Sequence, residues 1–291
     1  MLTSGRGVRA ITHCYRPSVS ASDVTDAYLA DLRLERQQPG LEALSAIMVR
    51  HIARYPFANI GVQLGEDLPL DLGSIYDRLV RRQRGGYCYD HNGLLIEVLA
   101  ELGYDVRLQM ARVLLTGSPH PPLTHRFTRV RLDGDEYIVD VGFGPNGPPF
   151  PVPMRTAGGN DSRYRVVAHG DVGFQFEERN QGGWLPLYRF DDVRCGDSDV
   201  VLGHFYSHRH PDAGFVRNLV ASLILTNEVR SLRNHDYWVI RADGTTSEQV
   251  ESPARLHEIL TQELRIMVTS SESDRLFSGS DRRTASSTGR E

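Results

Sequence analysis

Lysine is absent from this chain of 291 residues, so all 33 basic residues are arginine. A lysine Schiff base, a pyridoxal phosphate site and a Walker-type phosphate loop each need a lysine side chain, and the sequence excludes them. Cysteine is scarce as well. Cys14, Cys88 and Cys195 are far apart and odd in number, which is typical of a protein from a reducing compartment.

Long apolar runs and a strong excess of charge are also missing. No stretch of about 18 apolar residues occurs, and the N-terminal residues lack the apolar core of a signal peptide. The net charge of −4 gives no sign of nucleic acid or an anionic membrane as the main partner. We therefore expect a cytoplasmic protein, with two or three subdomains that share one site.

The most informative stretch, RGGYCYDHN, runs from Arg84 to Asn92. Two glycines precede Cys88, and a helical stripe of leucine and valine follows until Gly103, a usual helix-capping residue. Cys88 is thus predicted at a helix N-terminus, where unpaired N–H groups and the helix dipole favour an anion and hence a thiolate. The alternative is a small buried cysteine that packs a turn and is inert.

The hydrophobic pattern changes along the chain. Over residues 21–104 the apolar residues recur with a helical period, which predicts a helical first part. From Val106 they alternate with polar residues, which predicts a β region over 105–200, folded as a barrel or a strongly curved sheet. The expected fold class is therefore α+β.

The remaining segments give weaker signals. Residues 1–20 lack periodicity and are expected to be mobile, and the Ser/Arg/Asp-rich tail, 271–291, is expected to be disordered. Within 201–270, helical patterns occur at 213–225 and 254–265 and a strand pattern at 236–241. A strand at 219–225 is the alternative for the first of these.

A second chemical pattern lies in a predicted β-hairpin with Asp133-Gly134 as its two-residue turn. With this turn, His125 faces Gly142, and His125 and Asp140 become diagonal neighbours on one face, with Cα atoms roughly 7–8 Å apart. Asp140 lies in an apolar run, where a buried charge without a partner is costly. We therefore expect the Asp140 carboxylate to pair with the His125 imidazole.

Together the two patterns predict a catalytic triad. Cys88 is the nucleophile, His125 its base and ion-pair partner, and Asp140 the orienting carboxylate. The chain order, a helix cysteine before a hairpin histidine, is that of papain-like and transglutaminase-like sites. The alternative is a structural His–Asp pair at a strand end.

At these residues the sequence resembles the arylamine N-acetyltransferase family. The stretch from Arg84 to Asn92 is similar to the cysteine signature of that family, and VDVGFG, residues 139–144, to its aspartate motif. The intervals from 88 to 125 to 140 fit as well. Pro56-Phe57-x-Asn59 and residues 205–216 add matches, and the resemblance covers about residues 25–270.

The resemblance implies a helical bundle, a β-barrel and an α/β lid (201–270) that share one cleft. It also implies a ping-pong reaction of xenobiotic metabolism. Acetyl-coenzyme A acylates Cys88, coenzyme A leaves, and an arylamine or arylhydrazine takes the acetyl group. Acetyl-coenzyme A is thus the expected co-substrate, and no metal is expected.

The resemblance implies further site residues. Gly142 and Gly144 would let the backbone approach bound coenzyme A, as the matching loop of the family does. Phe57, Phe143 and Phe205 would wall an aromatic acceptor pocket. For each phenylalanine, plain core packing is the alternative.

The sequence also departs from the family pattern. Ala58 stands in place of a glutamate, so we expect Arg84 to lose its acidic partner. The small hydroxyl residues around the His-Pro pair are replaced by His208, Arg209 and Ala213. We predict that Arg209 takes over part of coenzyme A binding, because a guanidinium forms charge-assisted bonds to phosphate. A solvated loop residue is the alternative.

Three other interpretations remain open on sequence alone. An amide synthase with the same triad would use a tethered polyketide acyl chain. Metal binding through Cys88-x-x-His91, or through His204, His208 and His210, lacks the second cysteine pair of tight zinc sites. A non-catalytic binding module is disfavoured by an intact triad. The sequence leaves the acceptor and the oligomeric state, including a homo-oligomer, undecided.

Overall fold

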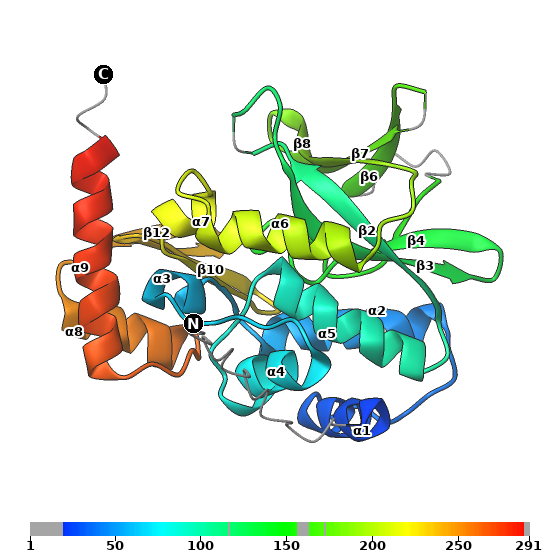
Figure 1. The fold of residues 1–291 in the computed structure, drawn as a ribbon, viewed down its shortest axis with the longest axis horizontal. Helices are drawn as coiled ribbons and strands as arrows, with labels where there is room; N and C mark the ends of the chain where they lie inside the picture. Colours follow the sequence, from blue (N-terminus) through cyan, green and yellow to red (C-terminus); the bar gives the residue numbers. More distant parts are fainter. Residues whose placement is uncertain (1–19, 116, 156–162, 172, 288–291) are drawn as a thin grey trace, which may run out of the picture.

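The computed structural model describes residues 20–115, 117–155, 163–171 and 173–287 (Figure 1). Helices come first along the chain, a seven-stranded, nearly closed barrel follows, and a five-stranded sheet with flanking helices comes last. This architecture confirms the predicted α+β fold of a helical bundle, a barrel and an α/β part. Within the described ranges, no helix is both long and apolar enough to cross a membrane.

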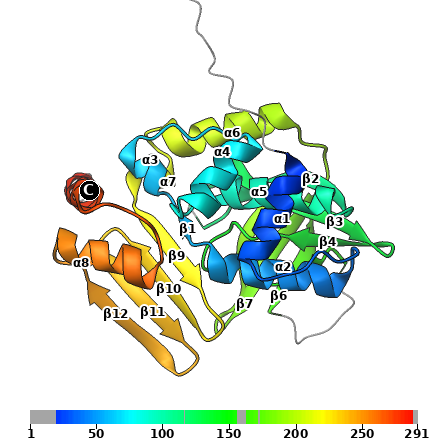
Figure 2. The same cartoon turned by 90° about the horizontal axis from the view of Figure 1, so that it is seen from below.

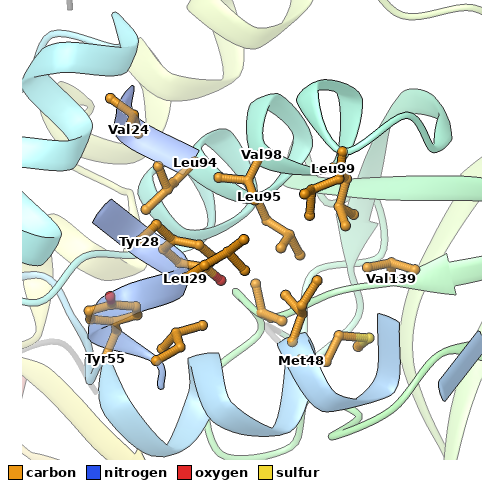
Figure 3. Packing of buried hydrophobic residues seen from close by; sticks show 14 of the residues in the cluster. Val24, Tyr28, Leu29, Met48, Tyr55, Leu94, Leu95, Val98, Leu99 and Val139 are labelled. Carbon is orange, nitrogen blue, oxygen red and sulfur yellow. The ribbon is translucent and has the colours of Figure 1, made fainter. Parts of the chain in front are cut away.

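The first part is helical because apolar side chains recur on one side of each longer segment. Its elements are α1 (Ala21–Asp31), α2 (Leu41–Arg54), α3 (Ile60–Leu64), α4 (Leu72–Tyr76), the π-helical segment η1 (Asp77–Arg81) and α5 (Cys88–Glu101). The apolar stripe of α5 is buried against α1, α2 and Val139 (Figure 3). Burying one leucine contributes about 1.5–3 kcal/mol, so this core fixes α5 and with it Cys88.

The barrel follows as antiparallel strands whose inward side chains are aromatic and aliphatic. They are β2 (Asp105–Val113), β3 (Leu123–Leu132), β4 (Asp135–Val139), β5 (Val152–Pro153), β6 (Tyr164–His169), β7 (Gly173–Asn180) and β8 (Gly183–Asp191). Their order is β5-β4-β3-β2-β8-β7-β6, and contacts between β5 and β6 nearly close the barrel.

The β3–β4 hairpin has the predicted turn and register. Asp133 and Gly134 both have positive φ, 53° and 88°, as a two-residue hairpin loop requires. Thr128 then pairs with Val139, the pairing that this loop length dictates. Asp140, the next residue, therefore lies at the end of β4 beside β3.

The last part contains a second antiparallel sheet. Its elements are α6 (Asp197–Arg209), α7 (Gly214–Arg217), β9 (Val220–Ile224), β10 (Glu228–Arg233), β11 (Asp236–Arg241), β12 (Gly244–Gln249), α8 (Pro253–Glu258), the π-helical segment η2 (Ile259–Glu263) and α9 (Ser270–Ser287). The short strand β1 (Phe57–Ala58), from the helical part, forms one edge beside β9. Helices α8 and α9 pack together along this sheet (Figure 2).

The C-terminal prediction is wrong for residues 271–287. They belong to α9, in which Leu276 is buried in the apolar core of the second sheet, and residues 288–291 lie outside the described residues. The polar composition of the tail hid this isolated apolar contact. Residues 213–225 are also not one helix: they divide into α7 and β9, so the strand alternative at 219–225 holds. The predicted mobile extension lies, except for Ser20, outside the described residues.

The predicted domain boundaries stay predictions. Helix α6 runs across the boundary placed at residue 200, and β1 pairs with a strand far from the helical part in sequence. Helix α6 packs against β3 of the barrel, and its His204 contacts Tyr87 at the start of α5. The parts are therefore interlocked around a common centre, where the candidate site lies.

Candidate active site

Cys88 is the first residue of α5, as predicted, and its side chain is buried. The Asp90 carboxylate accepts a hydrogen bond from the Tyr87 backbone N–H at 3.1 Å and forms a buried ion pair with Arg78 of η1. These contacts fix the start of the helix. The backbone N–H groups of Cys88 and Tyr89 have no intrahelical acceptor, because they belong to the first turn.

His125 on β3 pairs with a carboxylate beside Cys88. Its Nε2 donates to Asp140 Oδ2 at 2.7 Å, which leaves Nδ1 for the cysteine, whose Sγ lies 3.8 Å from the Thr124 carbonyl oxygen. Burial would lower the pKa of His125, but the charge and hydrogen bond of Asp140, together with Cys88, raise the pKa to about 10. The His125 ring therefore carries a proton at neutral pH.

Asp140 is fully buried, and every contact stabilises its charged form. Besides His125, the carboxylate accepts hydrogen bonds from Asn92 Nδ2 at 2.8 Å and from the Gly142 backbone N–H at 3.0 Å, both at Oδ1. Burial would raise the pKa of Asp140, but the charge of His125 and these hydrogen bonds lower it. The expected His125–Asp140 pairing is thus present, and the carboxylate orients the imidazole.

Asn92 is a site residue to which the sequence analysis assigned no role. Its amide donates to the Arg126 carbonyl at 2.7 Å as well as to Asp140, and its carbonyl accepts from the Val141 backbone N–H at 3.1 Å. One side chain of α5 thereby links both strands of the hairpin. A sequence signal existed, since Asn92 is a polar residue one helical turn after Cys88 and beside an apolar stripe.

Cys88 and His125 line a cavity of about 330 Å³, here called the Cys88 cavity. Its walls are largely apolar and aromatic and include Phe57, Val113, Leu115, Phe143, Phe215 and Trp238. A second cavity of about 660 Å³, the Tyr206 cavity, shares part of this lining. The shared residues are Val113, Leu115, Thr124, Phe215, Val220 and Arg233. The two cavities are therefore contiguous.

Two of the three predicted pocket phenylalanines lie in the Cys88 cavity. Phe57 and Phe143 line it, but Phe205 does not line either cavity and is 61% exposed. Phe205 belongs to α6, whose next residue, Tyr206, faces the second cavity. Successive helical side chains point in different directions, so Phe205 faces outward. Phe215 replaces it in the wall.

Gly142 and Gly144 lie where the backbone packs closely against other residues of the site. A Cβ on Gly142 would lie 2.8 Å from Cys88 Cα and 2.7 Å from Asn92 Nδ2, so only glycine lets this loop approach α5. Gly144, with φ of 83°, faces the Phe57 ring. Gly142 also lines the Cys88 cavity. The role of both glycines toward coenzyme A stays a prediction.

The structure does not place Arg209 in either cavity. Its exposed side chain is oriented toward Asp67, 3.5 Å away, because it leaves α6 on a different side from Tyr206. Arg233, at the end of β10, lines both cavities, and no carboxylate of the described residues forms an ion pair with it. Arg217 lines the Tyr206 cavity as well but forms an ion pair with Asp212. Arg233, which the sequence analysis missed, is therefore a cation available to the cleft.

The expected loss of the acidic partner of Arg84 is also wrong. Its guanidinium forms ion pairs with Glu66, after α3, and with Glu272 of α9, and it donates to the Met267 carbonyl at 2.9 Å. The hydrogen bonds and charges of the two glutamates outweigh burial and raise the pKa of Arg84. Carboxylates distant in sequence thus replace the glutamate missing at position 58.

The histidines considered as metal ligands have other partners. His91 Nδ1 is 2.7 Å from His51 Nε2, and the two ring nitrogens of His204 contact the Tyr87 hydroxyl at 2.6 Å and the Leu68 carbonyl at 3.0 Å. In the portion of the chain that the structure describes, no three His, Cys, Asp or Glu side chains gather as metal ligands.

Comparison with known proteins defines the class first. A family model described as N-acetyltransferase matches residues 40–273, so the chain is an acyltransferase. An arylamine N-acetyltransferase of Mycobacterium tuberculosis is 34% identical over 239 residues, 79% of this chain and 84% of that protein. One of Escherichia coli is 32% identical over 237 residues, 78% and 83% of the two chains.

Solved structures agree with these matches. The arylamine N-acetyltransferase of Salmonella typhimurium superposes with a TM-score of 0.82 at 26% identity, covering 88% of this chain and 98% of that one. The Mycobacterium marinum enzyme in complex with CoA gives 0.81 at 29% identity, covering 87% and 98%. The chain belongs to the arylamine N-acetyltransferase family.

Proposed function

We propose that the protein transfers an acetyl group from acetyl-coenzyme A to arylamines and arylhydrazines through an acetyl-Cys88 intermediate. The observation that carries this proposal is the buried His125–Asp140 pair beside Cys88 at the wall of an aromatic cavity. The M. marinum relative in complex with CoA supports the choice of donor. We place the reaction in the cytoplasm, where thiols stay reduced.

In the first half-reaction, the Cys88 thiolate attacks the thioester carbonyl carbon. The backbone N–H groups of Cys88 and Tyr89, free at the start of α5, stabilise the oxyanion. The carbon–sulfur bond to coenzyme A then breaks, and His125 gives its proton to the departing thiolate. Cys88 is left acetylated and His125 neutral, oriented by Asp140.

In the second half-reaction, the arylamine nitrogen attacks the acetyl-Cys88 carbonyl. Neutral His125 takes the proton that the nitrogen loses, and the bond from the carbonyl carbon to Cys88 breaks. The products are the N-acetylarylamine and the original thiolate–imidazolium pair. Proton and charge therefore balance over the two halves without a metal or a second base.

The cleft offers a place for each substrate. Phe57, Phe143 and Phe215 form an aromatic wall for the acceptor near the thiol. The larger Tyr206 cavity suits the nucleotide end of coenzyme A, and Arg233, between the cavities, suits its phosphates, because guanidinium–phosphate bonds are charge-assisted. The pantetheine arm would lie in the shared passage.

Initial-rate kinetics test this proposal. With acetyl-coenzyme A and an arylamine varied together, a covalent intermediate formed before the acceptor binds gives parallel double-reciprocal lines. Lines that converge would show that both substrates bind before any transfer. That result, or the absence of acetylated amine altogether, would overturn the proposal.

A further inference from the structure

We propose that His51 and His91 are positioning residues: with Tyr28 they form a buried, one-directional chain of hydrogen bonds that holds the turn before Cys88 against the strand that carries Phe57. The proposal deepens the proposed function, because it rests on Cys88 being the nucleophile. It concerns groups that the acetyl-transfer mechanism above does not use.

This chain of hydrogen bonds joins side chains of three helices. The Tyr28 hydroxyl of α1 is 2.8 Å from His51 Nδ1 of α2, and His51 Nε2 is 2.7 Å from His91 Nδ1 of α5. His91 Nε2 then lies 3.1 Å from the Gly86 carbonyl and 3.2 Å from the Pro56 carbonyl. All three side chains are buried, so water does not satisfy these groups.

The last contact determines the direction of every other. Carbonyl oxygens only accept hydrogen bonds, so His91 Nε2 carries the proton. In the neutral ring, Nδ1 is then an acceptor, which requires His51 Nε2 to donate. His51 Nδ1 is an acceptor in turn, and the Tyr28 hydroxyl donates to it. Both histidines are therefore neutral Nε2–H tautomers.

The charge environment agrees with neutral rings. Burial, together with neighbouring His91, lowers the pKa of His51 well below its usual value. Burial also lowers the pKa of His91, although the charges of Asp90 and Asp140 and the two carbonyls oppose it. A second proton on either ring would put a charge in an apolar core. It would also turn the Nδ1 acceptor of that ring into a donor and break the chain of hydrogen bonds.

The carbonyls that His91 holds belong to two segments that form the site. Gly86 lies two residues before Cys88, and Pro56 immediately precedes Phe57 of the cavity wall. The Ala58 backbone N–H also donates to the Gly86 carbonyl, at 2.6 Å, and the Phe57 ring stacks on the His91 ring with centroids 6.2 Å apart. His91 therefore clamps the turn before Cys88, which contains Gly86, to β1.

Two substitutions of His91 separate clamping from general packing. In His91→Gln, the side-chain amide nitrogen takes the place of Nε2 and keeps a donor toward the carbonyls. In His91→Asn, the shorter amide takes the place of Nδ1, keeps an acceptor for His51 and loses the clamp. His257→Gln, at a half-buried histidine on α8 bonded to Ser273, is the control.

The readout is the rate of Cys88 alkylation by iodoacetamide, measured in a Cys14→Ser/Cys195→Ser background beside the melting temperature. We expect His91→Gln and the control to stay within about 3-fold of the parent and His91→Asn to fall at least about 10-fold, because small displacements of a reacting group are costly. If the two His91 variants lose rate equally, or only in proportion to melting temperature, the clamp is refuted.

Nitrogen-15 NMR of labelled histidine gives a test on the unmodified chain. Both His51 and His91 should show the neutral Nε2–H pattern; an Nδ1–H tautomer or a charged ring at either position would overturn the proposal. Neither experiment uses an acetyl donor. A failure of the proposed acetyl transfer would therefore leave these results unchanged, and the two failures are distinguishable.

Discussion

The guanidinium of Arg84, four residues before Cys88, forms a two-point ion pair with the carboxylate of Glu272, 188 residues further along the chain. Both nitrogen–oxygen distances are 2.9 Å. Glu272 also caps its own helix, because it accepts a hydrogen bond from the Thr269 backbone N–H at 2.8 Å. The start of α9 is therefore tied to the loop that precedes Cys88.

Glu272→Gln should lower the free energy of unfolding by about 1–3 kcal/mol, because a hydrogen bond to a charged, mostly buried arginine is lost in part. Urea unfolding measures this change. Glu258→Gln, which removes an exposed carboxylate 3.2 Å from Arg255, is the matched control and should change stability by less than about 1 kcal/mol. Equal effects of the two substitutions would show that the Arg84 pair is an ordinary surface contact.

Asn92→Ala should reduce kcat by about 100-fold with little change in KM, because Asp140 and the hairpin lose their common link and the triad is misplaced. Steady-state kinetics measure this effect, and circular dichroism checks the fold. Asn180→Ala, in an exposed turn of the barrel, is the control. Activity near that of the control would mean that Asp140 is held by His125 and Gly142 alone.

Local rules explain what the sequence predicted well. A two-residue turn dictates the pairing of β3 with β4, so His125 and Asp140 could be placed together from spacing alone. The glycines and the apolar stripe likewise dictate that Cys88 begins a helix. These features depend on short stretches of chain.

The predictions that failed depend on the direction of side chains on a helix or on contacts between distant segments. Helix α6 lacks an apolar stripe, so the sequence did not indicate which way Phe205 and Arg209 point. The pairing of Arg84 with Glu272 joins segments that no local pattern connects. Both errors have the same cause: the packing of the third part on the first was not predictable from periodicity.

The His125 imidazole should remain protonated well above neutral pH. Its folded pKa of about 10 lies above the unfolded value of about 6.5. The stability that it contributes is therefore complete below about 6.5 and is lost as pH rises through about 10. In Asp140→Asn the pKa of His125 should fall and kcat should drop by about 10⁴-fold. NMR titration of His125 measures the shift, and an unchanged titration would contradict the role of Asp140.

Arg233→Ala should raise KM for acetyl-coenzyme A by about 10- to 100-fold, because a charge-assisted bond to phosphate is worth about 1.5–3 kcal/mol. The effect should shrink at high salt, and turnover of an aryl acetate, which lacks phosphates, should be unaffected. Arg209→Ala is the matched control and should change neither KM for acetyl-coenzyme A nor turnover of the aryl acetate. Equal losses with both donors in Arg233→Ala would rule out phosphate binding by this residue.

The intact mass of the protein after exposure to acetyl-coenzyme A without an acceptor tests the central claim most directly. We expect one added acetyl group, located on Cys88 by peptide mapping, absent in Cys88→Ala and removed when an arylamine is added. Cys195→Ala, which lacks a thiol outside the Cys88 cavity, should still be acetylated. An unmodified Cys88, or an adduct on Cys14 or Cys195 instead, would contradict the assignment of Cys88 as the nucleophile.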